Sequence, residues 1–187
     1  MAKKLKVIDL FCGVGGLSYG FAHDDNNFEI VAANEILPNM AKAYSLNHHK
    51  AKVYVEDIKD FGANKIEKDL GIKANDVDII VGGPPCQAYS TLGKRLMDDS
   101  RGKLFQEYYR VLEEFNPKLF LFENVKGLLS MRGGELLKTI VSLFESLRYK
   151  VRYKLLNAVD YGAPQIRERV IIIGSKLKND FQYPEPT

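Results

Sequence analysis

Near its N-terminus the chain reads Lys6-Val7-Ile8-Asp9-Leu10-Phe11-Cys12-Gly13-Val14-Gly15-Gly16, an apolar run that passes directly into a glycine-rich turn. The run Lys6–Phe11 predicts a buried strand, and Gly16–Ala22 predicts the helix that follows it. Glycines let the backbone turn tightly beside a ligand, and a helix N-terminus adds free N–H donors. Ser18 stands where a dinucleotide-binding motif has its third glycine. The turn alone therefore indicates either a nucleotide-like ligand or a plain tight connection.

Short runs rich in Val, Ile, Leu and Phe alternate with segments of helical length along the rest of the chain. This alternation predicts an α/β fold with a doubly wound, mostly parallel sheet, in which ligands bind beyond the carboxyl ends of the strands. The predicted strands are Lys6–Phe11, Glu29–Ala33, Val77–Val81, Leu119–Phe122 and Val170–Ile173, with Lys52–Val55 and Lys150–Asn157 as weaker candidates. The predicted helices are Gly16–Ala22, Pro38–Asn47, Leu104–Phe115 and Glu135–Leu147. The polar stretch Gln87–Lys103 is interpreted as a functional loop.

Length and composition indicate one ordinary globular domain. The chain has 187 residues, of which 45% are hydrophobic and 27% charged. A net charge of +3 permits a nucleic-acid partner without indicating one. Two cysteines make no disulfide framework, which favours an intracellular, reducing compartment. The histidines and cysteines lack metal-ligand spacing, and no apolar run is long enough to span a membrane, so neither a metal nor a membrane partner is expected.

Two acidic residues lie at the carboxyl ends of predicted strands, as the glycine turn does. Glu35 ends the second strand, where a carboxylate commonly binds the ribose hydroxyls of an adenosine ligand. The alternative is a solvated carboxylate at a strand end. Asp57 comes after the third strand, within possible reach of an adenine amino group. The spacing from the glycine turn to Glu35 favours the ribose interpretation.

The stretch Gly82-Gly83-Pro84-Pro85-Cys86-Gln87 follows the strand Val77–Val81 and is more specific. Two prolines restrict the backbone and hold Cys86 at the carboxyl end of the strand. A nucleophilic cysteine needs an exposed, electropositive setting that favours the thiolate, which Arg167 and Arg169 are placed to supply. The alternative is a buried structural cysteine, and that interpretation is preferred for Cys12.

Two further stretches add polar groups at strand ends. Phe122-Glu123-Asn124-Val125 ends a core strand and offers Glu123 as an acid or hydrogen-bond partner, or otherwise as a helix cap. Gln165-Ile166-Arg167-Glu168-Arg169 leads into the last strand. Alternate residues of an extended segment share a face, so both arginines are expected to face a carbonyl oxygen or a phosphate, or otherwise solvent.

With these stretches in order, the sequence resembles the cytosine-C5 DNA methyltransferase family of bacterial restriction-modification systems. The resemblance covers essentially the whole chain. It rests on the glycine turn, Pro84-Pro85-Cys86-Gln87, Glu123-Asn124-Val125, Gln165-Ile166-Arg167-Glu168-Arg169, Asp98-Asp99-Ser100-Arg101-Gly102 and Asp160-Tyr161-Gly162-Ala163-Pro164. It implies a Rossmann-like S-adenosylmethionine-dependent fold. It also implies a bacterial, cytoplasmic, nucleoid-associated enzyme that acts on a cytosine flipped out of double-stranded DNA.

The resemblance also implies roles for the matching positions. Cys86 is the expected nucleophile at C6 of cytosine, Glu123 the partner of the N3 and exocyclic amine edge, and Arg169 the partner of the O2 carbonyl, with Arg167 supporting the charge near the thiolate. The expected DNA contacts come from the loop after Cys86, at Gln87, Ser90 and Arg101. The expected S-adenosylmethionine site is lined by Phe11, Gly13, Val14, Gly15, Gly16, Glu35, Ile36, Asp57, Ile58, Pro84 and Leu104.

Full-length family members carry a target-recognition region and C-terminal motifs that complete the cofactor domain. Residues 1–187 match the cofactor-binding and catalytic domain, and the chain ends about where the recognition region begins. We expect a truncated protein, in preference to one subunit of a split enzyme with a second chain or a degraded gene product. We therefore expect poor DNA methylation by this chain alone. Three other functions remain open: a tRNA cytosine-C5 methyltransferase, a dinucleotide oxidoreductase and a non-catalytic subunit.

Overall fold

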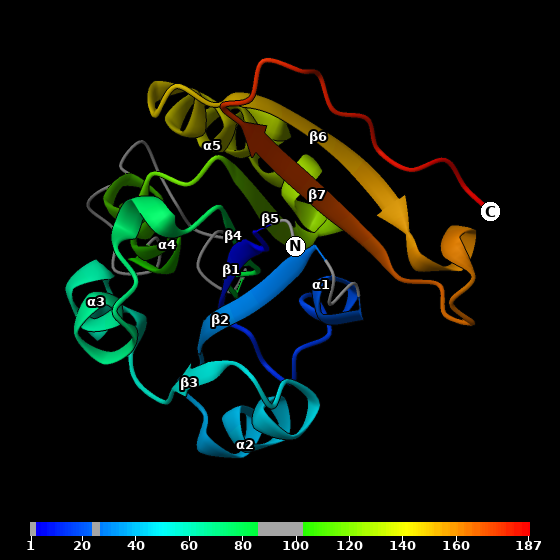
Figure 1. The fold of residues 1–187 in the computed structure, drawn as a ribbon. Helices are drawn as coiled ribbons and strands as arrows, with labels where there is room; N and C mark the ends of the chain where they lie inside the picture. The colour runs from blue at the N-terminus through cyan, green and yellow to red at the C-terminus, as the bar shows by residue number, and fades with distance from the viewer. Residues whose placement is uncertain (1–2, 24–26, 86–102) are drawn as a thin grey trace.

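A seven-stranded sheet with the order β3-β2-β1-β4-β5-β7-β6 forms the centre of the molecule (Figure 1). The structure, a computed structural model, describes residues 3–23, 27–85 and 103–187. The strands are β1 (Leu5–Leu10), β2 (Phe28–Asn34), β3 (Lys52–Tyr54), β4 (Ile79–Gly82), β5 (Leu119–Val125), β6 (Lys150–Asn157) and β7 (Glu168–Ser175). Each predicted strand is present, including both weaker candidates.

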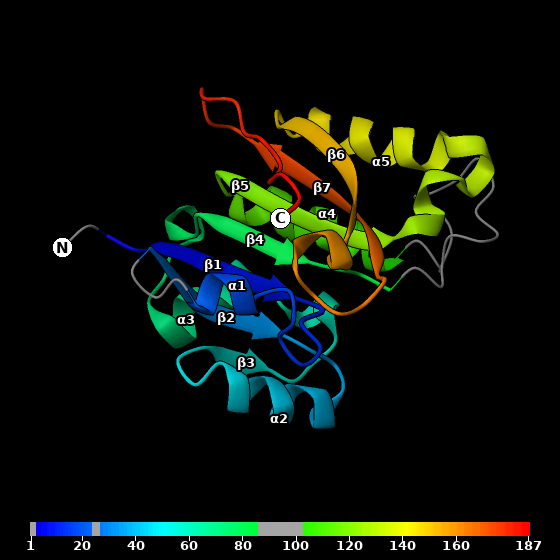
Figure 2. The same cartoon turned by 90° about the vertical axis from the view of Figure 1, so that its right-hand side faces the viewer.

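The strands from β3 to β5 run parallel, whereas β7 runs antiparallel to both β5 and β6. Figure 2 shows the arrows of β1, β4 and β5 pointing to the same end of the sheet, whereas the arrow of β7 points to the opposite end. The connection from Asn157 to Glu168 is too short for a helical crossover between parallel strands, so the chain returns antiparallel. The predicted mostly parallel α/β sheet is thereby confirmed, and the start of β7 lies at the carboxyl end of β5.

Helices cover both faces of this sheet. They are α1 (Tyr19–His23), α2 (Pro38–Asn47), α3 (Ala63–Leu70), α4 (Lys103–Phe115) and α5 (Glu135–Ser146). Side chains of α3, α4 and α5 join the main core cluster, while α1 and α2 contribute to two smaller clusters with other side chains of the same strands. Within the described ranges, no helix is long and apolar enough to cross a membrane.

Helix α3 was not predicted, because its sequence carries little apolar signal. Ile66 is its one fully buried side chain, and most of the others are charged or polar. Gly71 ends the helix in the left-handed conformation with φ of 67°, and its N–H donates to the Glu67 carbonyl. Ala63 and Leu70 pack against the core beside Ile66, and a helix this short depends on such packing for its stability.

Strand β5 has two unlike faces that position the site. Phe120, Phe122 and Asn124 are buried, whereas Leu119, Leu121 and Glu123 lie on the less covered face. On the buried side, the rings of Phe122 and Tyr108 of α4 pack edge to face at 5.2 Å. Glu123 was predicted at the end of a core strand whose bounds were set at Leu119–Phe122, and the strand continues to Val125. Glu123 therefore lies inside β5, paired with Ile171 of β7, so its backbone is held by the sheet.

Candidate active site

A cavity of about 590 Å³ opens where β1, β4 and β5 end and β7 begins; we call it the site cavity. Its position is the one that parallel sheets offer to ligands. Predicted site residues from three separate stretches of the sequence meet in its wall. They are Phe11, Val14, Gly16, Glu123, Arg167 and Arg169. Gly83, Leu156, Tyr161 and Ile171 are among the lining residues that were not predicted.

Glu123 and Arg169 form an ion pair across the end of the sheet. Arg169 Nε lies 2.8 Å from Glu123 Oε1, and both side chains are about three-quarters buried, with exposed fractions of 26% and 23%. Nη1 of Arg169 also donates to the Glu168 carbonyl at 2.8 Å. The pair places a carboxylate and a guanidinium side by side, each with hydrogen-bonding capacity left for a ligand.

The segment that precedes Cys86 is attached to the same strand end. Asn124 Nδ2 donates to the Pro84 carbonyl at 3.1 Å. Pro84 and Pro85 line an adjoining cavity of about 190 Å³ together with Glu123, Arg167 and Arg169. Cys86, Gln87, Ser90 and Arg101 lie outside the described residues, so their predicted roles stay predictions. Pro85 nevertheless shows that the chain approaches Cys86 beside the Glu123–Arg169 pair.

The glycine turn is held by Glu35 at the end of β2. The N–H of Gly13 donates to Glu35 Oε2 and the N–H of Leu37 to Glu35 Oε1, each at 2.9 Å. Glu35 is only 9% exposed, so these hydrogen bonds offset the cost of burying its charge. A carboxylate accepts more than two hydrogen bonds, which leaves the predicted ribose contact open as a prediction.

The remaining predicted cofactor residues have different settings. Ile36 is 58% exposed. Asp57 caps a short 3-10 turn by accepting the Lys59 N–H at 3.1 Å, and this backbone hydrogen bond lowers the pKa of its carboxyl. Ile58 is buried in the main core and Leu104 packs against that core. The structure does not bring these side chains into the wall of the site cavity, and their cofactor contacts stay predictions.

Asp9 is a site residue that the sequence interpretation missed. It is fully buried in the wall of the site cavity, and neither carboxylate oxygen has a hydrogen-bond partner among the described residues. Burial raises the pKa of Asp9 to about 7, against the opposing effect of the Ser18 and Tyr44 hydroxyls. The available signal was an acid in the middle of an apolar strand, which is costly unless the group is used.

Replacing Asp9 with asparagine is expected to stabilise the protein increasingly as the pH rises. The folded state keeps the Asp9 proton up to a pKa of about 7, whereas the ordinary value is 3.8. The wild type therefore loses stability between these values as the pH increases, and asparagine does not titrate. The difference in free energy of unfolding should grow by roughly 2–3 kcal/mol from pH 5 to pH 8. Urea unfolding of both proteins measures it, and a pH-independent difference would contradict the expectation.

Cys12 lies in the same wall but is unsuited to act as a nucleophile. It is 6% exposed and packs with Ala33 and Tyr44. Burial, with the negative charges of Asp9 and Glu35, raises the pKa of the Cys12 thiol well above its usual range. This setting agrees with its predicted packing role.

Comparison with known proteins supplies the family. The model of the family described as C-5 cytosine-specific DNA methylase matches residues 5–187. The chain belongs to this family. Its predicted resemblance is thereby confirmed, and family and fold together imply the use of S-adenosylmethionine.

Similar proteins with curated names are Type II methyltransferases. The chain is 42% identical over 183 residues to M.XorII of Xanthomonas oryzae pv. oryzae, which covers 96% of the chain and 43% of that protein. It is 44% identical over 186 residues to M.FnuDI of Fusobacterium nucleatum, with 97% and 51% covered. It is 39% identical over 191 residues to M.AquIA of Picosynechococcus sp., with 97% and 76% covered. The chain thus spans about half the length of the first two relatives.

Solved structures agree with this assignment. A putative DNA modification methyltransferase encoded within a prophage of E. coli matches with a TM-score of 0.79 at 36% identity, over 96% of this chain and 49% of that one. The Dnmt2 methyltransferase of S. pombe matches with a TM-score of 0.72 at 24% identity, over 96% and 52%, and supports the fold alone.

Proposed function

We propose that residues 1–187 form the cofactor-binding and catalytic domain of a DNA cytosine-C5 methyltransferase of a restriction-modification system. The observation that carries the proposal is the Glu123–Arg169 ion pair. It lies in one cavity with the glycine turn and in an adjoining cavity with Pro84 and Pro85. A pyrimidine edge needs a carboxylate for its N3 and amine side and a cation for its O2 carbonyl. The pair offers both next to the segment that leads to Cys86.

The site cavity suits S-adenosylmethionine in charge and shape. Its wall combines the apolar side chains of Phe11, Val14 and Leu17 with the carboxyl groups of Asp9 and Glu123, a lining that suits a cationic ligand with apolar parts. When bound, S-adenosylmethionine supplies the methyl group. The residues proposed to hold it are Phe11, Gly13, Val14, Gly15, Gly16, Glu35, Ile36, Asp57, Ile58, Pro84 and Leu104.

The proposed reaction begins with a cytosine extruded from the duplex, which costs a few kcal/mol. The Cys86 thiolate adds to C6, and its electron pair makes the ring an enamine that is nucleophilic at C5. Glu123 hydrogen-bonds the N3 and amine edge, which favours the ring protonated at N3. Arg169 binds O2, and Arg167 stabilises charge near the thiolate. After C5 is methylated, the C5 proton leaves to solvent and the C6–S bond breaks, which restores the thiolate.

Transfer of tritiated methyl groups tests the proposal against the tRNA alternative. Duplex DNA and tRNA are incubated with tritiated S-adenosylmethionine and the chain, with a target-recognition region supplied in cis or as a second chain. We expect label in DNA, because the relatives with shared motifs are Type II methyltransferases. Label in tRNA alone would contradict the proposed DNA substrate and support the tRNA methyltransferase alternative. Absence of label in both, together with no binding of S-adenosylhomocysteine, would refute the function.

A further inference from the structure

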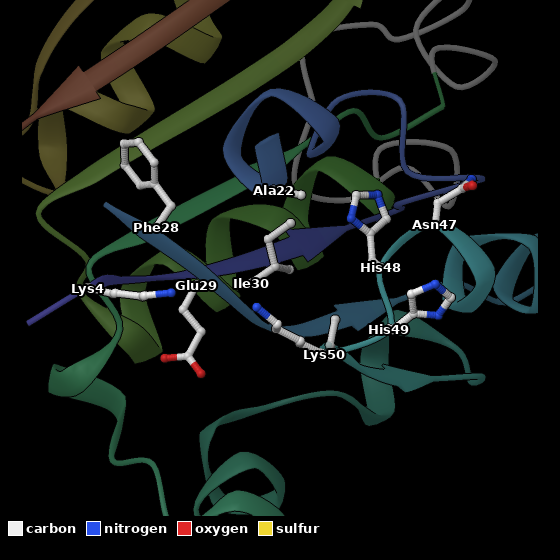
Figure 3. A pocket seen from close by; sticks show the side chains of 10 residues that line it. Lys4, Ala22, Phe28, Glu29, Ile30, Asn47, His48, His49 and Lys50 are labelled. Carbon is white, nitrogen blue, oxygen red and sulfur yellow. The ribbon is translucent and has the colours of Figure 1, made fainter. Parts of the chain in front are cut away.

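The end of helix α2 contacts the glycine turn through two consecutive side chains. Asn47 Nδ2 donates to the Val14 carbonyl at 2.9 Å, and His48 Nε2 lies 3.1 Å from the Gly15 carbonyl. Figure 3 shows both side chains on the wall of a second cavity of about 510 Å³, with Asn47 reaching the segment that follows β1. A carbonyl oxygen only accepts hydrogen bonds, so Nε2 of His48 carries a proton here.

The histidine ring is fixed by a buried polar group of neighbours. Tyr44 packs against it with ring centroids 4.3 Å apart, and the Tyr44 hydroxyl lies 3.1 Å from Ser18 Oγ. Ser18 Oγ itself donates to the Gly15 carbonyl at 3.3 Å. Ser18 and Tyr44 are fully buried and His48 is 5% exposed. Because the ring is enclosed, it holds the Gly15 carbonyl in one place.

Holding these carbonyls also orients the N–H groups of the turn. In a trans peptide the C=O and the next N–H point in opposite directions. The Val14 carbonyl faces Asn47, and accordingly the Gly15 N–H donates elsewhere, to the Cys12 carbonyl at 2.9 Å. The Gly15 carbonyl faces His48, so the Gly16 N–H points away from α2. Val14 and Gly16 both line the site cavity.

We propose that Asn47 and His48 are positioning residues that set the glycine turn for S-adenosylmethionine. The inference rests on the proposed function, and it assigns a role to side chains outside the site cavity. Without these two donors, the Val14–Gly15 peptide keeps only the Gly15 N–H bond to the Cys12 carbonyl, and the Gly15 carbonyl keeps only the longer bond from Ser18 Oγ. Both peptide groups are then less firmly held. Ordering the turn then costs part of the binding free energy.

Calorimetric titration of S-adenosylhomocysteine into the full chain tests the proposal. Asn47→Asp removes the donor at an exposed position and should weaken binding roughly fivefold, by the loss of one hydrogen bond. His48→Leu should weaken binding roughly tenfold, because the buried Gly15 carbonyl loses the shorter of its two hydrogen bonds and keeps only the one from Ser18 Oγ. His48→Gln keeps an N–H donor at the position of Nε2 and should recover binding to within about threefold of the wild type.

Asn64→Asp is the matched control, since Asn64 is an exposed residue on α3, which packs on the other face of the sheet. Its affinity should equal that of the wild type. If the wild type binds and the Asn47→Asp and His48→Leu variants bind equally tightly, the positioning role is overturned while the proposed function stands. Failure of His48→Gln to recover binding that His48→Leu loses would assign His48 to packing instead. If His48→Leu does not fold, Asn47→Asp decides the outcome, and a wild type that binds nothing refutes both proposals.

Discussion

Cys86→Ser is expected to abolish covalent trapping of the protein by an oligonucleotide that contains 5-fluorocytosine. In the proposed reaction Cys86 adds to C6, and fluorine at C5 prevents the loss of a proton that would release the enzyme. The adduct therefore accumulates and migrates as a shifted band in a denaturing gel. A serine hydroxyl is far less acidic than a thiol, so the variant should form no detectable band.

Cys12→Ser is the matched control, because it removes the other cysteine of the chain. Cys12 is buried and its pKa is raised, so it contributes no thiolate, and this variant should be trapped like the wild type. Trapping is measured with S-adenosylmethionine present and at high protein concentration, since the chain spans about half of M.XorII and M.FnuDI. An adduct that survives in Cys86→Ser and disappears in Cys12→Ser would overturn the assignment of the nucleophile.

Gly15→Ala should weaken binding of S-adenosylhomocysteine by at least about a hundredfold. Gly15 has φ of 94°, a conformation that costs an L-residue about 1–3 kcal/mol. An added Cβ would also lie 2.2 Å from His48 Nε2 and 2.4 Å from its Cδ2. The buried ring has to move, and the Gly15 carbonyl then loses its hydrogen bond from His48, which costs about another 1–3 kcal/mol. Calorimetry gives the dissociation constants.

Gly13→Ala separates the backbone strain from the collision with His48. Gly13 has φ of 54°, and an added Cβ there would meet nothing within 4 Å. This variant should lose roughly tenfold in affinity from strain alone. Equal losses of affinity in Gly13→Ala and Gly15→Ala would show that the close approach of His48 to Gly15 has no effect on cofactor binding by the glycine turn.

The strands illustrate how far the sequence predicted the fold. Runs such as Leu119–Phe122 and Val170–Ile173 are apolar throughout, because a strand covered on both faces has no polar side, and such runs are recognisable without a structure. Helix α3 has eight residues, and its apolar positions Ala63, Ile66 and Leu70 are too few to distinguish it from the polar sequence around it. The direction of β7 could not be predicted from its composition, because a buried strand has the same apolar side chains whether it runs parallel or antiparallel to its neighbour.

For the candidate site, the motifs identified the chemical groups and their order. The structure showed that Glu123 lies inside β5 and that it pairs with Arg169 of β7. It also placed Asp9, an isolated acid within an apolar run, in the wall of the site cavity. His48, which is distant from the glycine turn in sequence, contacts the Gly15 carbonyl. Isolated polar residues carry no pattern, so their roles depend on which neighbours the fold brings to them.

By itself, the sequence determined the family, the α/β class and the residues proposed for catalysis, because motifs and apolar runs are local along the chain. Only the tertiary structure decided which of these groups touch. The antiparallel return of β7 brings Arg169 to Glu123, and the end of α2 brings Asn47 and His48 to the carbonyls of Val14 and Gly15. These contacts join residues far apart in sequence. Their distances follow from how the sheet and the helices pack, and no single segment of the sequence determines that packing.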